Sequence, residues 1–401
     1  MTELQHKRKQ RRKQTAEDFT PEPLVNEMLD KLPEEIWSDP NATFCDPVCG
    51  TGKFLMGILE RLNEGLQNEI PDEEERKSHI IENQIYGVDN VKFKSIITQN
   101  LLGTKGLKHH ITNEDSLTKD WENMKFDVVV GNPPYKGNFH LAFLKKAYEI
   151  SKRWIIWVHP SNWIINRKGA TQEYKNMKNL INPGLKETII FNGNPVFNVK
   201  LASPFGILVI DKSVNNKTIK FEDRINNKSD IYNDINQINK FGDLLYFDLE
   251  KKVLNLANKD SFFDHRNVKN GPYYINIARI RGNVELKDPS KIYKDDFFSL
   301  MPRDRGVEKQ IHQEFYLSFK NNEEAKNCLS FIRTRWAMFG MSIYKIGGSS
   351  GTSELKGIPW LDWSESWTED KFEKLINATT AEIAFVKENI PDYYGITKKA
   401  K

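Results

Sequence analysis

The sequence has little cysteine and no long hydrophobic run. Its 401 residues include three cysteines, Cys45, Cys49 and Cys328, with no Cys-x-x-Cys pair and no Cys/His cluster. This count excludes a disulfide framework and indicates no zinc site, so we expect no metal and a reducing, cytoplasmic compartment. No apolar run approaches the roughly 20 residues that span a bilayer, so we expect neither a membrane partner nor an export signal.

A strong excess of charge is also absent. The chain has 59 Lys and Arg residues against 55 Asp and Glu residues, a formal net charge of +4, which permits a polyanionic partner without requiring one. Residues 1–13 form a basic arm, because residues 7–13 read Lys-Arg-Lys-Gln-Arg-Arg-Lys without apolar periodicity. Two interpretations of this arm stay open, a solvated tail and a contact with phosphates.

Strand-like and helix-like segments alternate over residues 14–212. Seven strands are predicted, at residues 42–46, 84–89, 109–112, 126–130, 154–159, 187–191 and 205–211. Helices are predicted at residues 52–66, from there to about 81, and at 91–102, 139–151 and 172–181. Residues 192–204 are Pro/Asn-rich and loop-like, so the last two strands are expected to be antiparallel. The predicted class is α/β, a doubly wound, seven-stranded, mostly parallel sheet.

The composition changes after residue 212. Asn/Lys-rich segments with scattered aromatic residues replace the alternation, so residues 213–401 are expected to form a second domain. Apolar residues from Ala325 to Phe339 recur every three or four positions and predict one helix, with Arg333 and Arg335 on its opposite face. A glycine-rich loop at 347–351 and a closing helix from about Thr368 are expected to follow.

The sequence Gly131-Asn132-Pro133-Pro134-Tyr135 directly follows the strand at 126–130, and parallel sheets bind ligands at the carboxyl ends of their strands. Its residue types suit methylation of an exocyclic amine, whose lone pair is delocalised into a ring. The Asn132 side-chain oxygen and the Pro133 carbonyl would accept the amine hydrogens and stabilise the developing positive charge. Pro133 and Pro134 stiffen the loop, and Tyr135 offers a face on which a base can stack. The plainer interpretation is a turn that ends a strand.

A glycine-containing turn, Asp46-Pro47-Val48-Cys49-Gly50-Thr51-Gly52, follows the first strand and opens a helix. Gly50 and Gly52 permit close approach of a ligand to the backbone, and the helix N-terminus offers N–H groups to a carboxylate. The spacing Gly-x-x-x-x-Gly-Lys-Ser/Thr is absent, which excludes a phosphate-binding P-loop.

Two acidic residues lie at the next two strand ends, since Asp89 ends the second predicted strand and Asp115 follows the third. Asp89 is suited to accept hydrogen bonds from ribose hydroxyls, and Asp115 could accept one from an adenine amine. For either residue alone a turn or helix-cap role is the plainer interpretation. Their positions at successive strand ends favour contact with a cofactor.

Residues 46–55, Asp115 and residues 132–135 together resemble the amino-methyltransferases of DNA, in the motif order of their gamma class. The resemblance covers roughly residues 14–212 and implies transfer of a methyl group from S-adenosyl-L-methionine to N6 of a flipped-out adenine in double-stranded DNA. Residues 17–25 match the family's leading segment, and Thr20-Pro21 also predicts a helix N-cap. The family's Gly-x-Phe-Tyr-Thr-Pro form is here Glu-Asp-Phe-Thr-Pro.

The resemblance also implies roles for further residues. Phe19 and Thr20 would hold the methionine end of the cofactor, and Phe197 would lie near the target base with Tyr135. The implied cofactor-binding set is Phe19, Thr20, Asp46, Cys49, Gly50, Gly52, Phe54, Asp89 and Asp115. Residues 213–401 would form a target-recognition domain. Its candidates for DNA contact are Arg279, Arg281, Arg303 and Arg305, for which an ordinary solvated surface is the plainer interpretation.

Other substrates and roles fit parts of the pattern. An RNA adenine methyltransferase or a cytosine-N4 DNA enzyme would keep the chemistry, although the latter usually has Ser at the position of Asn132. Enzymes of release-factor amides place a helical domain first. A non-catalytic subunit that binds nucleic acid is the alternative from another class, and the intact Asn132, Asp46 and glycines disfavour it. We expect the cytoplasm of a bacterial or phage-infected cell, a possible separate restriction endonuclease of the same specificity, and no stable protein partner.

Overall fold

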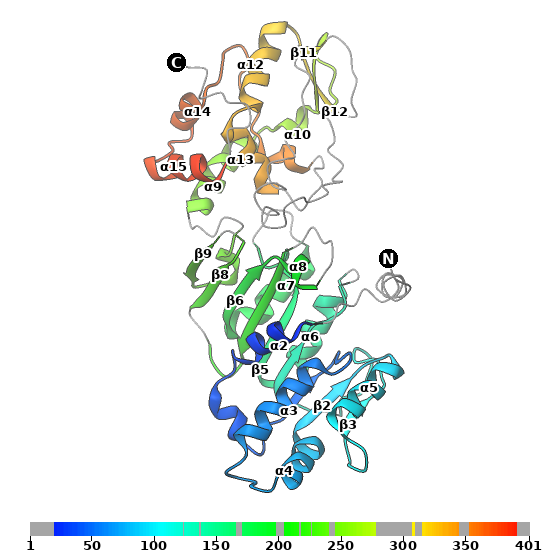
Figure 1. Ribbon diagram of the computed structural model, residues 1–401. Helices are drawn as coiled ribbons and strands as arrows, with labels where there is room; N and C mark the ends of the chain where they lie inside the picture. Colours follow the sequence, from blue (N-terminus) through cyan, green and yellow to red (C-terminus); the bar gives the residue numbers. More distant parts are fainter. Residues whose placement is uncertain are drawn as a thin grey trace. The chain divides into compact units, whose positions relative to one another are not determined.

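The structure is a computed structural model. It describes residues 20–122, 124–135, 138–165, 171–197, 204–215, 218–225, 227–239, 245–277, 307–308, 315–344 and 353–390. The basic arm, Phe19, the loop at 347–351 and the four candidate arginines Arg279, Arg281, Arg303 and Arg305 lie outside these ranges. The chain divides into two compact units, residues 1–164 with 172–235 and residues 165–171 with 236–401, and most of their elements are labelled in Figure 1.

The first unit is built on one large sheet. Its strands are β1 Phe44–Asp46, β2 Ile85–Val88, β3 His110–Thr112, β4 Phe126–Gly131, β5 Ser151–Pro160, β6 Leu185–Phe191, β7 Phe205–Asp211, β8 Ile219–Asp223 and β9 Lys228–Tyr232. They lie in the order β3-β2-β1-β4-β5-β7-β6-β8-β9. Strands β3 to β5 are parallel to one another, and β7 runs antiparallel between β5 and β6. The predicted α/β class and the antiparallel last pair are confirmed.

The expectation of seven strands is wrong, because β8 and β9 extend the sheet to nine strands in the part of the chain that the structure describes. Strand β8 pairs in parallel with β6, and β9 pairs antiparallel with β8. The sheet therefore continues past residue 212, where a second domain was expected to begin. Strand β9 contains Lys228, Ser229 and Asp230, which are half-buried or exposed. Polar residues keep an edge strand from pairing with another chain. They also make such a strand difficult to recognise from its sequence.

Helices of the first unit end close to their expected positions. They are α2 Glu22–Leu29, α3 Lys53–Gly65, α4 Glu73–His79, α5 Lys92–Leu102, α6 Phe139–Ile150, α7 Gln172–Ile181 and α8 Gly193–Phe197. Single turns occur at Glu34–Ser38, Ile80–Gln84, Asn182–Gly184 and Ile235–Gln237. Helix α8 lies in a segment expected to be a loop, and the Asn192 side chain accepts a hydrogen bond from the Asn194 N–H at its start (3.0 Å). Helices α2 and α3 pack together on one face of the sheet, in a core that includes Val128 and Ile156.

The second unit combines helices with a small sheet. Its helices are α9 Leu245–Ala257, α10 Phe262–His265, α12 Asn322–Ile332, α13 Arg335–Tyr344, α14 Glu369–Leu375 and α15 Thr380–Asn389, with a turn at Ser353–Gly357. Strands β10 Tyr273–Ile277, β11 Val307–Glu308 and β12 Phe315–Phe319 are antiparallel in the order β11-β10-β12. Among the helices that the structure describes, none is long and apolar enough to cross a membrane.

The single helix expected from Ala325 to Phe339 is two helices, α12 and α13. The chain turns at Thr334, whose hydroxyl donates to the Phe331 carbonyl (2.7 Å) and accepts from the Ala337 N–H (3.3 Å). Arg335 does not lie on an open face, because its guanidinium bonds Glu369 (3.2 Å) and the Ile390 carbonyl (3.1 Å). The sequence did not reveal this break, because the apolar residues keep their three- and four-residue spacing on both sides of the capping threonine.

Candidate active site

Asn132 follows β4 at the topological switch point of the sheet, where the connections from two neighbouring strands lead in opposite directions. Strands β1 and β4 are parallel neighbours, with Cys45 opposite Val129, so the residues after each strand meet at one edge. The connections from β1 and β4 lead to opposite sides of this point, which is where open α/β sheets bind ligands. The predicted turn after β1 and the predicted loop after β4 therefore lie side by side.

The Asn132 side chain lies between two hydroxyl groups. Its Nδ2 donates to Thr20 Oγ1 (3.0 Å), and the Tyr135 hydroxyl donates to its Oδ1. Thr20 is buried, whereas Asn132 and Tyr135 are half-buried. The expectation that Thr20 caps a helix is wrong, because α2 begins at Glu22 with Pro21 at its N-cap and no side-chain cap. The Thr20 hydroxyl contacts the catalytic candidate instead.

Tyr135 and Phe197 contact each other directly. Their ring centroids are 6.2 Å apart at an interplanar angle of 69°, and Tyr135 also meets Phe205 edge-on at 5.1 Å. Phe197 is 2% exposed and packs against Phe205 at 4.7 Å. A base stacked between two rings needs them about 7 Å apart and parallel. The two aromatic candidates are thus neighbours, and they must separate before a base can stack between them.

The turn after β1 requires glycine at both expected positions. Gly50 and Gly52 have φ angles of 56° and 80°, in the left-handed region. A Cβ at Gly52 would lie 2.7 Å from Thr98 Cγ2 of α5. The Thr98 hydroxyl donates to the Gly50 carbonyl (3.1 Å), so α5 both supports this turn and limits its side chains.

Two buried carboxyl groups lie at this turn. Asp89 accepts from the N–H groups of Gly50 (3.1 Å) and Val91 (2.8 Å), and burial raises its pKa to about 6 in spite of these bonds. Asp46 is 1% exposed and accepts from the Val48 N–H (2.9 Å). Burial, with a smaller contribution from the charge of Asp89, raises the pKa of Asp46 to about 8 against that hydrogen bond. Such a pair favours a ligand that donates hydrogen bonds or is positively charged.

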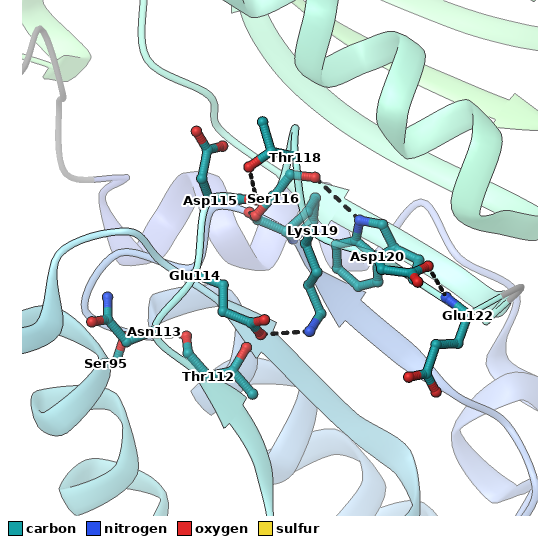
Figure 2. Close-up of polar contacts among 12 residues, drawn as sticks. Ser95, Thr112, Asn113, Glu114, Asp115, Ser116, Thr118, Lys119, Asp120 and Glu122 are labelled. Atoms are coloured by element: carbon teal, nitrogen blue, oxygen red, sulfur yellow. Dashed lines mark hydrogen bonds and ion pairs between the residues drawn. The ribbon is translucent and has the colours of Figure 1, made fainter.

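Asp115 lies on the loop after β3, next to the same turn. Its Oδ1 accepts from the Leu117 N–H (3.0 Å), and its side chain is exposed. In Figure 2 its carboxylate points away from Glu114 and Lys119, which face each other. The hydroxyl of the next residue, Ser116, donates to the Pro47 carbonyl and thereby fastens this loop to the turn after β1.

Two further candidates for cofactor contact are buried. Phe54 is 3% exposed and belongs to the core beside α2, so its ring lies in the protein interior. Cys49 is 5% exposed, its N–H donates to the Val88 carbonyl (3.0 Å), and burial raises the pKa of its thiol.

Sequence reasoning missed the polar side of α5. This helix buries Ser95 and Thr98 as well as Leu102 and exposes Phe93 (59%) and Leu101 (51%), so its buried side is partly polar, unlike that of an ordinary amphipathic helix. The Ser95 hydroxyl lies 3.3 Å from the Thr112 carbonyl and 3.4 Å from that of Asp89. Ser95 and Thr98 stand three residues apart, and this spacing of small hydroxyl residues was the available signal.

The site fits S-adenosylmethionine, the cofactor that the resemblance implies. The two glycines with positive φ have no side chain that would keep a ligand away from the backbone of the turn. Two carboxyl groups beside the turn suit a molecule that has an ammonium group, a sulfonium centre and ribose hydroxyls. Within the described residues, no three His, Cys, Asp or Glu side chains gather as a metal would require.

Similarity to known proteins covers part of this chain. Residues 3–164 match the family model described as N-6 DNA Methylase. An uncharacterized adenine-specific methylase of Mycoplasma pneumoniae is 26% identical over 44% of this chain and 62% of its own length. The methylase subunit of the type I restriction enzyme MjaIX of Methanocaldococcus jannaschii is 31% identical over 29% of this chain and 18% of its own. The chain thus spans less than two thirds of either relative.

Solved structures with partial likeness include the methyltransferase subunit of a type I restriction-modification system from Streptococcus thermophilus. It is 17% identical, with a TM-score of 0.39, over 52% of this chain and 48% of that one. The type IIG restriction endonuclease BpuSI is 11% identical, with a TM-score of 0.43, over 94% of this chain and 67% of that one. The strand order and the family-model match are the stronger observations, and that match makes residues 3–164 similar to the N-6 DNA Methylase family.

Proposed function

We propose that this chain transfers a methyl group from S-adenosyl-L-methionine to N6 of an adenine in double-stranded DNA. This proposal rests on the position of the Asn132 amide. It lies at the topological switch point of the sheet, beside the glycine turn, and it is hydrogen-bonded to Thr20 and Tyr135. An amide oxygen fixed there can accept a hydrogen from an exocyclic amine without reorganising during the reaction.

Asn132 and Pro133 would act on the target amine together. The Asn132 Oδ1 and the Pro133 carbonyl each accept one amine hydrogen, so the nitrogen lone pair is withdrawn from the ring and turned toward the methyl donor. Carbonyl oxygens have two lone pairs, so Oδ1 can accept from the Tyr135 hydroxyl and from the amine at once. Pro134 keeps the loop rigid, and Tyr135 with Phe197 would stack on the extruded base after the two rings separate.

The residues around the turn would hold the cofactor. When bound, S-adenosylmethionine supplies the methyl group on a positively charged sulfur. Gly50 and Gly52 admit it to the backbone, Asp89 would accept from its ribose hydroxyls, and Asp115 from its adenine amine. Asp46, Cys49 and Thr20 would line the turn, Phe54 would support it from the core, and Phe19 is the remaining candidate.

Recognition of the DNA sequence would belong to the second unit. We place the target-recognition domain within residues 213–401, in the part that follows β9, with Arg279, Arg281, Arg303 and Arg305 as candidates for contacts with guanine edges and phosphates. The basic arm at 1–13 would add phosphate contacts whose strength falls with salt. Protection against a restriction endonuclease of the same sequence specificity is the biological role we propose.

The direct test is to express the chain in a host that lacks adenine methylation and to sequence its DNA with modification-sensitive detection. N6-methyladenine at one recurring motif is expected. Methylation of host RNA alone, or N4-methylcytosine in the DNA, would contradict the substrate that we propose.

Asn132→Ala should lower the single-turnover rate of methyl transfer about 100- to 1000-fold, because it removes a preorganised acceptor that acts in the transition state. Affinities for cofactor and DNA should change little. Asn138→Ala is the matched control, since Asn138 ends the same loop and its amide donates to Glu173 (2.6 Å) on the surface. A rate for Asn132→Ala that equals that of Asn138→Ala would exclude the catalytic role.

A further inference from the structure

The orientation of the Asn132 amide decides what a target amine meets. An amide side chain has an acceptor oxygen on one side and a donor NH2 group on the other, and a half-turn exchanges them. The NH2 group of Asn132 faces Thr20 Oγ1, and its oxygen faces the Tyr135 hydroxyl. A half-turn would point the NH2 group at the amine, so two donors would oppose each other.

The two flanking hydroxyls differ in chemistry. A phenolic O–H is more acidic than an aliphatic one, so Tyr135 is the better donor and Thr20 is the better acceptor. The observed arrangement uses each hydroxyl in its stronger role. Thr20 therefore favours the amide orientation that presents oxygen to the amine.

Thr20 is itself held by the protein core. The helix that follows it, α2, buries Leu24, Val25, Met28 and Leu29. A Cβ at Gly57 of α3 would lie 3.0 Å from Leu29 and 3.3 Å from Val25, so α2 and α3 are in close contact. The Thr20 hydroxyl is not used to cap α2. It is thus a fixed polar group brought to Asn132 from 112 residues away in the sequence.

We propose that Thr20 is a positioning residue for the methyl transfer, whose hydroxyl holds the NH2 side of Asn132 so that Oδ1 faces the target amine. This inference rests on the proposed function and adds to it the group that selects the reactive orientation. It gives Thr20 a role separate from contact with the cofactor.

The test compares Thr20→Val, which keeps the side chain's shape without the hydroxyl, with Thr20→Ser, which keeps the hydroxyl. Each full-length variant is measured for single-turnover methylation, for cofactor affinity by calorimetry, and for affinity to duplexes with adenine or hypoxanthine at the target position. Hypoxanthine has an acceptor oxygen where adenine has its amine. Because the same duplexes are used for every variant, the cost of extruding each base cancels in the comparison.

Thr20→Val should methylate about tenfold more slowly, as expected for the loss of one hydrogen bond. Its preference for adenine over hypoxanthine should fall by a similar factor, and Thr20→Ser should resemble the wild type in both. An unchanged preference in Thr20→Val, with weakened cofactor binding and a normal rate at saturating cofactor, would make Thr20 a cofactor ligand and overturn the inference.

A double-mutant cycle with Asn132→Asp covers the case in which Thr20→Val alone is poorly folded. Aspartate presents an acceptor on both sides, so its orientation does not matter, and Thr20→Val should cost much less in that background. An equal loss in both backgrounds would mean that Thr20 acts through folding alone. If the wild type itself forms no N6-methyladenine, the proposed function fails; if it does and Thr20→Val matches it in rate and preference, only this inference fails.

Discussion

Asp46 has a carboxyl group whose protonation is tied to folding. Its pKa of about 8 in the folded chain lies above the ordinary value of 3.8, mainly because the group is buried. The folded protein therefore keeps a proton that the unfolded chain releases between about pH 4 and pH 8. Stability contributed by this group is present at low pH and is lost as the pH rises through that range.

Asp46→Asn should remove this loss, because an amide oxygen can still accept from the Val48 N–H but cannot ionise. We expect the variant to gain stability over the wild type as the pH is raised from 5 to 9, by up to a few kcal/mol. Thermal melts in the absence of cofactor would measure it. Asp39→Asn is the matched control, since Asp39 is exposed and its carboxylate accepts from the Asn41 N–H in the same way (2.8 Å). Parallel pH profiles for Asp46→Asn and wild type would refute the assignment.

At the scale of residues, the positions of the motif residues in the sheet could be predicted from the sequence, whereas their chemical roles stay predictions. Asn132, Gly50 and Asp89 lie at the strand ends where their motifs place them, because the motif and the end of the strand are adjacent in sequence. The contact of Thr20 with Asn132 could not be predicted, since it joins residues far apart. A helix-cap role for Thr20 was expected from its neighbour Pro21, and tertiary contact decided otherwise.

At the scale of elements, α5 acts as a brace for the glycine turn. Its hydroxyl residues contact the turn and the ends of β2 and β3, and its C-terminal Gly103 has a positive φ. The order in which helices and strands alternate was predictable because apolar periodicity marks each one. Strands β8 and β9 and the break between α12 and α13 were not, because a polar edge strand and a capping threonine leave that periodicity unchanged.

Gly52→Ala should weaken cofactor binding and lower stability by more than left-handed strain alone, which costs about 1–2 kcal/mol. The added Cβ would meet Thr98 Cγ2 at 2.7 Å. Gly106→Ala isolates the strain, since its φ is 83° and its Cβ would have no neighbour within 4 Å. Adding Thr98→Ser, which deletes Cγ2, should recover part of the loss in Gly52→Ala. Equal melting temperatures for Gly52→Ala and Gly106→Ala would mean that α5 does not restrict the turn.

At the scale of the whole molecule, the boundary between the sheet and the second unit lies later in the sequence than the change of composition after residue 212 suggests. The sheet ends at Tyr232, so a fragment of residues 1–235 keeps all nine strands, whereas one of residues 1–212 loses β8 and β9. Loss of β8 would leave the apolar strand β6 at an open edge, which promotes aggregation.

We expect the 1–235 fragment to remain monomeric and to bind S-adenosylmethionine, and the 1–212 fragment to melt at a lower temperature or to aggregate. Neither should methylate one discrete motif if the second unit recognises the DNA sequence. Light scattering, calorimetry and mapping of methylated sites would measure these properties. A well-behaved 1–212 fragment with full cofactor affinity would show that β8 and β9 are dispensable, and motif-specific methylation by 1–235 would place recognition in the first unit.

The position of β7 between β5 and β6 has a consequence for folding during translation. As the chain leaves the ribosome, each of the strands β2 to β5 can pair with a strand already made, but the neighbours of β6 are β7 and β8, which both come later. At translation speeds of about 5–20 residues per second, the stretch from residue 192 to 211 takes about 1–4 s to synthesise. During that interval a nascent strand with Ile189, Ile190 and Phe191 has no partner, and it is then that a chaperone would be needed most.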